Sequence, residues 1–438
     1  MSVSNFYLPR NIHGYPAVTF SDVAQELTRP ALDRLWPGSN KYDLIIIGGG
    51  YTGLSAALHA KQVMPEWRVL LLEAKQIGAG ASGKSAGHVN DRFEAQEGDI
   101  YHQHGRELGE KLLRAAQAGP DLVRSIIERH KLDCDVRDGY VFVDRDGSKR
   151  IVHGKDFGID PYPFVLGMAQ AARQQGVKIV EFSRVTNLTE SPWGQVLEVN
   201  HHAKPLLARY VIAAGGHAMG RDIPLLRQET LGRTVELNIT TVKSEPLPLG
   251  SANHFYPEVG RERLPGADTK LDVEYWSLDR AGRLIFGSRS SADGQNQSKL
   301  ERAITSDLLK RFPEIVPDFH RANGRDPVIT PLVRSEPISF TRDLMPNVGS
   351  AGMARKILYV NGLGGHGIAL GTLLGKEAVN KIRALETGDQ AAGAVFDQFA
   401  AMHHARTPVQ EPLRRMASRA GVAYVKAMDW LKSKTPTR

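Results

Sequence analysis

The sequence predicts an α/β fold, and three segments that lie far apart in the chain support that prediction. Residues 44–47 form a continuous apolar run that leads into glycines spaced G-x-G-x-x-G and then into a helical pattern over about residues 52–61. Residues 208–220 carry another apolar run, which ends on a glycine pair, and residues 356–382 follow the order strand, glycine loop, helix. Such runs are typical of strands buried on both faces of a parallel sheet.

The first segment has the spacing of a Rossmann-like dinucleotide site. Gly48 permits a tight turn, Gly50 lets the backbone approach a pyrophosphate, and Gly53 lets the helix pack on the strand. A second buried strand, residues 68–72, ends on Glu73, whose carboxylate suits ribose hydroxyls and disfavours a 2′-phosphate. The pattern predicts dinucleotide binding, and a glycine-rich turn in an ordinary βαβ unit is the alternative.

Two further glycine loops favour FAD over a nicotinamide cofactor. Directly after Glu73, Gly78, Gly80, Gly83 and Gly87 alternate with Ala and Ser, so that backbone N–H groups can line a flat ligand. A nicotinamide enzyme has no evident need of this second loop. In residues 356–382 a helix begins at the glycine loop, and its dipole would stabilise a reduced, negatively charged flavin.

The remaining elements alternate between helices and strands. Gly371 and Gly375, four residues apart, predict close packing of the last sheet-associated helix on a neighbour. Residues 236–290 alternate as strands do. The other expected elements are a polar helix over residues 96–130, a hairpin at 139–152, a helix at 162–175, a strand pair at 178–190, a hairpin at 271–290 that turns at 279–282, a helix at 300–312 and a basic helix at 412–434.

Composition narrows the class of protein. The chain has 438 residues, 41% hydrophobic and 24% charged, which fits a globular protein of one large or two smaller domains. It has no apolar stretch long enough to span a membrane and no export signal. Its one cysteine, Cys134, suits a reducing compartment. We therefore expect a cytoplasmic protein. The basic C-terminal helix is expected to pack on the protein itself or on a second subunit, and peripheral contact at the inner membrane face is the alternative.

The net charge of +8 does not by itself indicate nucleic acid. Lys and Arg are scattered, and no nucleic-acid-binding signature is present, so we expect no nucleic-acid partner. The histidine pairs at residues 201–202 and 403–404 lack neighbouring ligands at metal-binding spacing, so we expect no metal site.

Six stretches resemble the D-amino-acid-oxidase-like family of FAD-dependent amine and amino-acid oxidoreductases, and within it the gamma-glutamylputrescine oxidoreductase group. They are residues 46–58, 71–89, 211–216, 244–247, 282–287 and 361–370, in family order. The resemblance implies a discontinuous Rossmann-like FAD-binding domain with an inserted antiparallel-sheet substrate domain. The implied limits are an N-terminal arm at 1–40, FAD-binding segments at 41–95, 162–235 and 341–385, substrate-domain segments at 96–161 and 236–340, and a helical tail at 386–438.

The glycine loops and their flanks supply the expected FAD contacts. By resemblance, the Val185 backbone meets the adenine. The full set is Gly48, Gly50, Tyr51, Thr52, Gly53, Glu73, Ala74, Gly80, Ala81, Ser82, Gly83, Lys84, Ser85, Gly87, His88, Val185, Ala214, Gly215, Gly216, Gly362, Gly364, Gly365, His366, Gly367 and Ile368.

The sequence departs from relatives at points that bear on reactivity. Lys84 and Ser85 stand where much of the group has Arg and Asn, so the wall of the pocket near the flavin is expected to differ. Ile285 stands nearest to the lysine by which sarcosine oxidases promote reaction with oxygen, which favours a dehydrogenase over a strong oxidase. No cysteine occurs in the C-terminal region, so FAD should be bound non-covalently.

The implied reaction passes a hydride from the carbon beside an amine nitrogen to flavin N5, and the resulting imine hydrolyses. Because the cofactor performs the difficult step, no strong general base is required. The expected substrate is a small amine or amino acid, and the acceptor of the electrons is oxygen or a quinone. The alternatives are a flavin-bound binding or assembly module without turnover and a nicotinamide dehydrogenase.

Five side chains are candidates for the substrate pocket. His366 lies in the third glycine loop beside the expected flavin edge, although its backbone alone is an equal alternative. Tyr275 and Trp276 are strand neighbours, so one of them should face the pocket, and packing of both within the sheet is an equal alternative. Arg334 and Arg342 approach the third loop, where a guanidinium can clamp a carboxylate, and a surface ion pair is the alternative for each.

Overall fold

The computed structural model describes residues 40–144, 148–246, 263–269, 273–280, 282–291, 297–312 and 332–410, and residues 413–414, 416–420, 422–423 and 427 of the C-terminal segment. The chain divides into two compact units, Met1–Lys41 and Tyr42–Arg438, and the glycine loops all lie in the second. The predicted N-terminal arm, residues 1–40, lies outside the described residues except for its last position.

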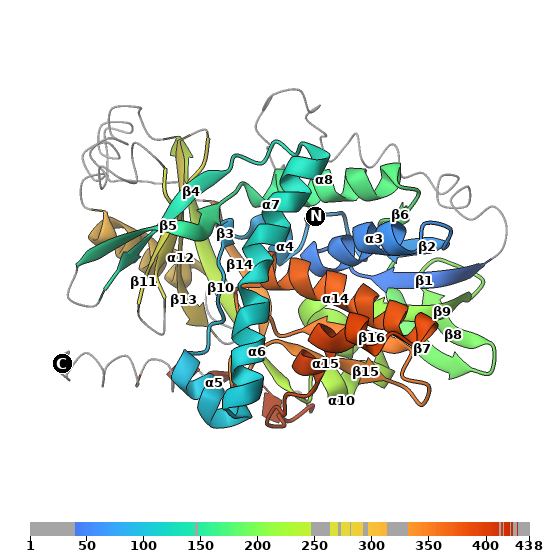
Figure 1. Ribbon diagram of the computed structural model, residues 1–438. Helices are drawn as coiled ribbons and strands as arrows, with labels where there is room; N and C mark the ends of the chain where they lie inside the picture. Colours follow the sequence, from blue (N-terminus) through green and yellow to red (C-terminus); the bar gives the residue numbers. More distant parts are fainter. Residues whose placement is uncertain are drawn as a thin grey trace, which may run out of the picture. The chain divides into compact units, whose positions relative to one another are not determined.

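The first sheet has eight strands among the described residues and contains the predicted parallel core (Figure 1). Its main path runs β15-β16-β9-β1-β2-β6, and β8 joins β7 to β9. In β1, Leu44 pairs in parallel with Val69 of β2, and the apolar run from Leu44 to Ile46 is fully buried. The bounds are β1 Lys41–Ile47, β2 Val69–Leu72, β6 Lys178–Val180, β7 Val185–Ser191, β8 Gly194–Val199, β9 Leu206–Ala213, β15 Asn347–Ala351 and β16 Ile357–Asn361.

Two helices that follow glycine loops pack against each other, as Figure 1 shows. They are α3 (Tyr51–Val63) and α14 (Gly367–Thr387). A Cβ on Gly375 would lie 2.2 Å from the Thr52 carbonyl oxygen, and the Ser55 hydroxyl donates to the Thr372 carbonyl at 2.6 Å. The close packing predicted from the glycine spacing is therefore observed.

The polar helix predicted over residues 96–130 is three helices in the structure. They are α5 (Glu97–His104), α6 (Arg106–Ala116) and α7 (Ala118–His130). Gly105 has φ +78°, in the left-handed region, so the helix cannot continue through it. Side chains from all three, including Ile100 and Val123, enter the same core as β1 and α3.

The second sheet also has eight strands among the described residues, in the order β14-β10-β13-β12-β11-β4-β5-β3. Helix α12 (Gln297–Arg311) packs on it, and together they bury Trp276, Phe286 and Phe312. The predicted hairpin at residues 271–290 is confirmed for β12 and β13, because Trp276 pairs with Phe286. The bounds are β3 His88–Val89, β4 Arg137–Val143, β5 Lys149–Gly158, β10 Thr234–Pro246, β11 Gly266–Asp268, β12 Tyr275–Leu278, β13 Arg283–Ser291 and β14 Leu332–Thr341.

One predicted pairing is wrong. The strands of residues 178–190 do not pair with each other: β6 extends the first sheet beside β2, and β7 pairs with β8. The chain turns between them at Phe182, whose φ is +55°.

The remaining elements are α4 Ala81–Lys84, α8 Pro161–Gln174, η1 Gly216–Ala218, α9 Met219–Asp222, η2 Pro224–Leu226, α10 Arg227–Thr230, η4 Gln390–Gly393 and α15 Ala394–Ala400.

The described part of the C-terminal helix packs on its own protein. Arg414, Ser418 and Val422, spaced four apart, are buried. The Arg414 guanidinium donates to the carbonyls of Leu231 and Thr234 at 2.6 and 2.7 Å. Met416 is exposed, and Val425 and Trp430 lie outside the described residues.

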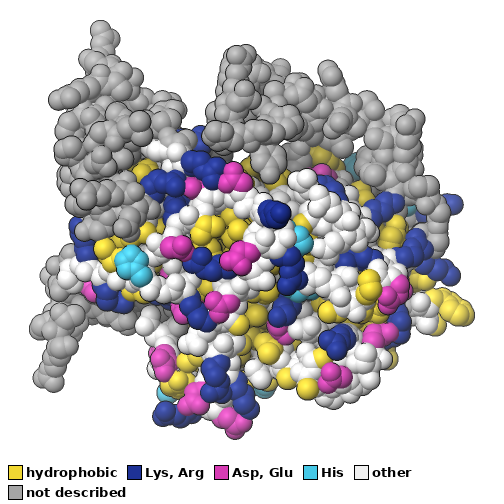
Figure 2. All heavy atoms as spheres, turned by 45° about the horizontal axis from the view of Figure 1, so that its top comes forward, with side chains coloured by type: hydrophobic (Ala, Val, Ile, Leu, Met, Phe, Trp, Pro, Cys, Tyr) yellow, Lys and Arg dark blue, Asp and Glu magenta, His cyan; other side chains and the backbone are white. Residues whose placement is uncertain are grey.

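The distribution of surface charges and the hydropathy of the helices agree with what the sequence predicts. Figure 2 shows Lys and Arg interspersed with Asp and Glu on the face in view, without a continuous basic surface. Among the helices of the described residues, none is long and apolar enough to cross a bilayer.

Candidate functional site

Glycine loops and an acidic residue follow four adjacent strands of the first sheet, in the order β16, β9, β1 and β2. Because Tyr359 of β16 pairs in parallel with Ala213 of β9, the loops that follow these two strands leave the sheet together. The Ala214 N–H donates to the Ile47 carbonyl at 2.8 Å, so the ends of β9 and β1 also coincide. Ligands of open α/β sheets bind at this edge, beyond the carboxyl ends of the strands.

The glycine loop after β1 fits against the end of β9 only because it contains glycines. Gly48 has φ +106°, and a Cβ there would lie 2.5 Å from the Ala214 carbonyl oxygen. A Cβ on Gly53 would lie 1.9 Å from the Gly48 carbonyl oxygen. The backbone therefore approaches both the neighbouring strand end and its own helix more closely than any other residue allows.

The second glycine loop meets the first through Ser82. Its hydroxyl lies 3.4 Å from the Tyr51 N–H, and the Tyr51 hydroxyl donates to the Ser82 carbonyl. A Cβ on Gly50 would lie 2.8 Å from Ser82 Oγ. In the same loop Gly87, with φ +80°, leaves room for the Ile159 carbonyl. The loops predicted to hold one ligand are thus in direct contact.

Glu73 is held at the end of β2 by backbone donors. Its carboxylate accepts from the N–H groups of Gly49 at 2.7 Å and Lys75 at 2.8 Å. The Ser183 N–H donates to the Glu73 carbonyl at 2.8 Å, which brings the start of β7, and with it Val185, beside this corner. Ala74 is half-buried next to Glu73. This arrangement fixes the direction of the carboxylate before any ligand binds.

The third glycine loop ends at the first turn of α14. Gly362, Gly364 and Gly365 all have positive φ, between 57° and 85°, which explains the glycines. His366 is the N-cap of α14, and its Nδ1 donates to the Gly364 carbonyl at 3.2 Å. Burial lowers the pKa of His366 to about 4. Gly367 and Ile368 form the first turn of the helix that follows.

His88 connects the second loop to the second sheet. Its Nε2 lies 3.0 Å from the Trp276 carbonyl, which can only accept, so this nitrogen carries the proton. Its Nδ1 then accepts from the Tyr140 hydroxyl at 2.8 Å. Burial lowers the pKa of His88 to about 3, so the ring is neutral at physiological pH. Its ring centroid is 5.7 Å from that of Tyr275.

The two strand neighbours Tyr275 and Trp276 have different environments. Tyr275 lies with His88, and its ring crosses Gly287 of the paired strand, where a Cβ would be 1.9 Å from Tyr275 Cζ. Trp276 is fully buried against Phe312, 5.7 Å between centroids. The structure therefore does not bring the Trp276 ring to the cluster around His88.

The candidate cations near the pocket are not brought together. Lys84 forms an ion pair with Glu336 of β14. The side chain of Arg334 lies outside the described residues, although its backbone, in β14, pairs with Thr241 of β10. Arg342 is exposed, whereas its neighbour Asp343 is buried against His404. Arg342 therefore stands on the surface.

Sequence reasoning missed Glu94, which lies beside the third loop. Its Oε2 is 3.6 Å from His366 Nδ1, and its Cβ is 3.6 Å from the position of a Cβ on Gly364. Burial raises the pKa of Glu94 to about 7. The residue follows the second glycine loop by seven positions, and no motif in that stretch distinguishes it from a surface acid.

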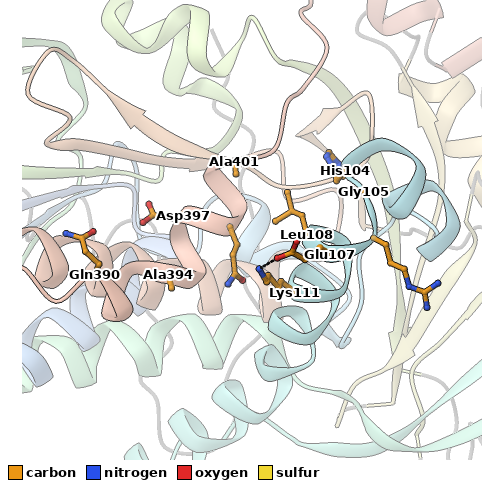
Figure 3. Close-up of a pocket in the computed structure, with 11 residues that line it drawn as sticks. His104, Gly105, Glu107, Leu108, Lys111, Gln390, Ala394, Asp397 and Ala401 are labelled. Carbon is orange, nitrogen blue, oxygen red and sulfur yellow. Dashed lines mark hydrogen bonds and ion pairs between the residues drawn. The ribbon is translucent and has the colours of Figure 1, made fainter.

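A surface hollow of about 710 Å³ lies away from this site, between α5, α6, η4 and α15 (Figure 3). Its lining residues include His104, Lys111 and Gln398. None of the site residues predicted from the sequence lines it. Within the described ranges, no group of three or more His, Cys, Asp or Glu side chains is placed to hold a metal ion.

Comparison with known proteins identifies related chains. Residues 43–153 and 149–381 match the family described as FAD dependent oxidoreductase. The gamma-glutamylputrescine oxidoreductase of Escherichia coli K12 is 25% identical over 429 residues, covering 89% of this chain and 93% of that protein.

Two solved structures share the fold. The L-proline dehydrogenase of P. horikoshii superposes with a TM-score of 0.61 at 14% identity, covering 83% of this chain and 98% of that one. The glycine oxidase of Geobacillus kaustophilus superposes with a TM-score of 0.56 at 18% identity, covering 76% and 92%.

Proposed function

Because the chain belongs to the FAD-dependent oxidoreductase family, we propose that it oxidises a carbon–nitrogen bond of a small amine or amino acid to an imine. One observation carries this proposal. The glycine loops at the ends of β16, β9 and β1 lie beside a cluster of neutral, aromatic and acidic side chains that includes His88, Tyr275 and Glu94. A cofactor edge and a substrate chamber are the two parts that such a reaction needs.

The residues present fit FAD. Gly48 and Gly50 let the first loop lie close against Ala214 and Ser82, and the Glu73 carboxylate accepts hydrogen bonds as a partner of ribose hydroxyls must. The N-terminus of α14 offers N–H groups at the far end of the site. We assign FAD to these loops, with the contacts predicted from the sequence. When bound, FAD supplies the acceptor for the hydride.

We propose that FAD is bound without a covalent link. The sequence has one cysteine, Cys134, which is buried in the core with Val123 and Phe157. Both ring nitrogens of His88 already have hydrogen-bond partners. Denaturation in acid should therefore release all of the yellow colour into the supernatant, and colour that stays in the protein pellet would contradict the proposal.

In this proposal His366 and Tyr275 line the substrate chamber. His366 contacts Glu94 at the start of α14, and Tyr275 contacts His88 from the second sheet. Trp276 supports the strand from behind, and Arg342 is omitted because it is exposed. We propose that the first sheet binds FAD and that the second sheet, with β3 to β5 and β10 to β14, forms the cover of the substrate chamber.

The names of related proteins support the substrate class. The Escherichia coli relative is named for gamma-glutamylputrescine, and the two solved structures are named for L-proline and glycine. All three names denote compounds that contain an amine nitrogen. Ile285 in β13, at the position nearest the oxygen-reactive lysine of sarcosine oxidases by resemblance, favours a dehydrogenase that passes electrons to a quinone.

We further propose that any contact with an anionic membrane uses the outer face of the C-terminal helix. Leu413 and Met416 are exposed there, whereas Arg414 and Val422 on another face are buried. Binding of the full chain to anionic and to neutral vesicles, compared by sedimentation, tests this.

An anaerobic flavin assay tests the function. The purified yellow protein is mixed without oxygen with a panel of primary amines, secondary amines and amino acids, and flavin absorbance is recorded. We expect bleaching by members of the amine class, slow reoxidation in air and faster reoxidation by a quinone. Colour without bleaching across the panel would favour a flavin-bound module without turnover, and a colourless protein would contradict FAD binding.

A further inference from the structure

We propose that the Glu94 carboxylate binds the ammonium group of the substrate. The site then takes an amine whose reacting nitrogen is cationic in water, and this substrate needs no carboxylate of its own. This inference rests on the proposed function, because it names the substrate class for the same chamber. It assigns a role to a residue that no motif marks.

The position of Glu94 places it at the junction of the two parts of the site. Its side chain lies against the third glycine loop, 3.6 Å from a Cβ position on Gly364 and 3.6 Å from His366 Nδ1. It is 26% exposed, so a bound molecule can reach it although protein surrounds most of it. Within the described residues no cation is hydrogen-bonded to it, and partial burial of an unpaired carboxylate is costly, so a cationic ligand would stabilise it.

The charges that face Glu94 come from three elements. His366 of α14 is neutral at pH 7, because burial lowers its pKa to about 4. Tyr140 of β4 is neutral as well, because burial raises its pKa, and Glu94 raises it further. Arg92, two residues before Glu94, is the third group, and its guanidinium forms an ion pair with Asp156. Among the described residues Glu94 therefore has no fixed counter-ion, and burial raises its own pKa to about 7.

The guanidinium that a substrate carboxylate would need is already occupied. Arg92 forms an ion pair with the buried Asp156 and lies over the Phe142 ring at 4.6 Å. Breaking that pair would leave Asp156 buried without a counter-ion, which is costly. In the described part of the chamber an ammonium therefore meets a free carboxylate and aromatic faces, whereas a carboxylate meets no free cation.

The step assigned to Glu94 is a proton transfer. The substrate ammonium gives one N–H proton to a Glu94 carboxylate oxygen, the nitrogen keeps the electron pair of that bond, and no oxidant takes part. The nitrogen lone pair is then available while the adjacent carbon loses its hydride. Desolvation in the chamber lowers the pKa of the ammonium toward that of Glu94, which makes the transfer feasible.

A matched pair of non-oxidisable ligands tests the proposal on the holoenzyme. tert-Butylammonium has no hydrogen on the carbon that bears nitrogen, and pivalate has nearly the same shape with the opposite charge. The Kd of each is measured from the change in flavin absorbance at about pH 6 and about pH 8 for the natural protein, Glu94→Gln and the control Glu97→Gln. Glu97 is exposed on α5, three residues further along the chain.

We expect the natural protein and the Glu97→Gln control to bind tert-butylammonium roughly tenfold more tightly at about pH 8 than at about pH 6, because Glu94 ionises between these values. Glu94→Gln should bind it roughly tenfold more weakly at the higher pH and without pH dependence. Pivalate should bind weakly to all three.

Two results would overturn the assignment. One is that the affinity of Glu94→Gln for tert-butylammonium depends on pH as that of the natural protein does. The other is that the natural protein binds pivalate more tightly than tert-butylammonium. If Glu94→Gln does not retain flavin, the pH dependence of the natural protein alone decides, since a flat profile contradicts the proposal. These outcomes are separate from the function test, because a protein that no amine bleaches fails that test whatever the ligand titration shows.

Discussion

At the scale of single residues, strand alternation assigns neighbouring side chains to different tasks. Tyr275 contacts His88, and Trp276 fills the core between β12 and α12. Both environments depend on a glycine in the paired strand, Gly287 for the tyrosine and Gly266 for the tryptophan. One aromatic residue therefore contributes to the site and the other to stability.

Truncating the two rings should separate these roles. Trp276→Ala should lower the free energy of unfolding by about 3–5 kcal/mol, because it leaves a cavity in a sealed core. Tyr275→Ala should cost less than about half of that and instead weaken tert-butylammonium binding. Urea unfolding and the ligand titration measure the two effects. Equal losses of stability, or unchanged ligand affinity in Tyr275→Ala, would contradict this division.

At the scale of elements, the position of the third loop depends on how closely α14 packs on α3. Gly371 and Gly375 bring the helices together, with a Cβ on Gly371 2.9 Å from Thr52 Oγ1. The same two helices carry the glycine loops at their N-termini. Their packing distance therefore sets the separation between the loops that we assign to FAD.

Replacing Gly375 by alanine tests this coupling. In an ordinary helix the change would stabilise by up to about 1 kcal/mol. Here the new Cβ would meet the Thr52 carbonyl, so we expect a loss of about 1–3 kcal/mol and a lower ratio of flavin to protein absorbance.

Gly98→Ala in α5 is the matched control for Gly375→Ala. A Cβ there has no atom within 4 Å, so this variant should be neutral or slightly stabilised and should keep its flavin. If both variants behave alike, close packing of α14 does not position the third loop.

At the scale of the whole molecule, several histidines are buried as neutral rings. Burial lowers the pKa of His59 and of His366 to about 4, and that of His88 to about 3. Each of these pKa values is below the ordinary value of 6.5, so the unfolded chain binds protons that the folded chain does not. The stability that these neutral histidines contribute is therefore fully present above about pH 6.5 and decreases as the pH falls toward 4.

His59 allows the effect to be measured away from the candidate site. It is held by the Ser55 carbonyl at 2.7 Å within α3. From pH 7 to pH 5 its protonation in the unfolded chain should remove about 2 kcal/mol of stability. His59→Gln should reduce the loss between these pH values by that amount in urea unfolding, and the exposed His153→Gln should not. An unchanged loss in His59→Gln would contradict the assignment.

The sequence by itself determined the parallel core, the positions of the glycine loops and most strand and helix limits. These features depend on local patterns, namely apolar runs, glycine spacing, and glycines such as Gly48 at positions where the backbone has a positive φ. The same local logic failed at residues 178–190, where two adjacent strands join different neighbours, and at Gly105, where one predicted helix divides.

Only the tertiary structure decided which side chains meet. Glu94 and His366 are separated by more than half of the chain, and only the folded structure brings their side chains within 3.6 Å of each other. Arg342 and Trp276 looked as suitable as Tyr275 in sequence, yet one is exposed and the other is in the core. Burial and long-range pairing set the charge and access of a side chain, and neither is encoded in its immediate neighbours.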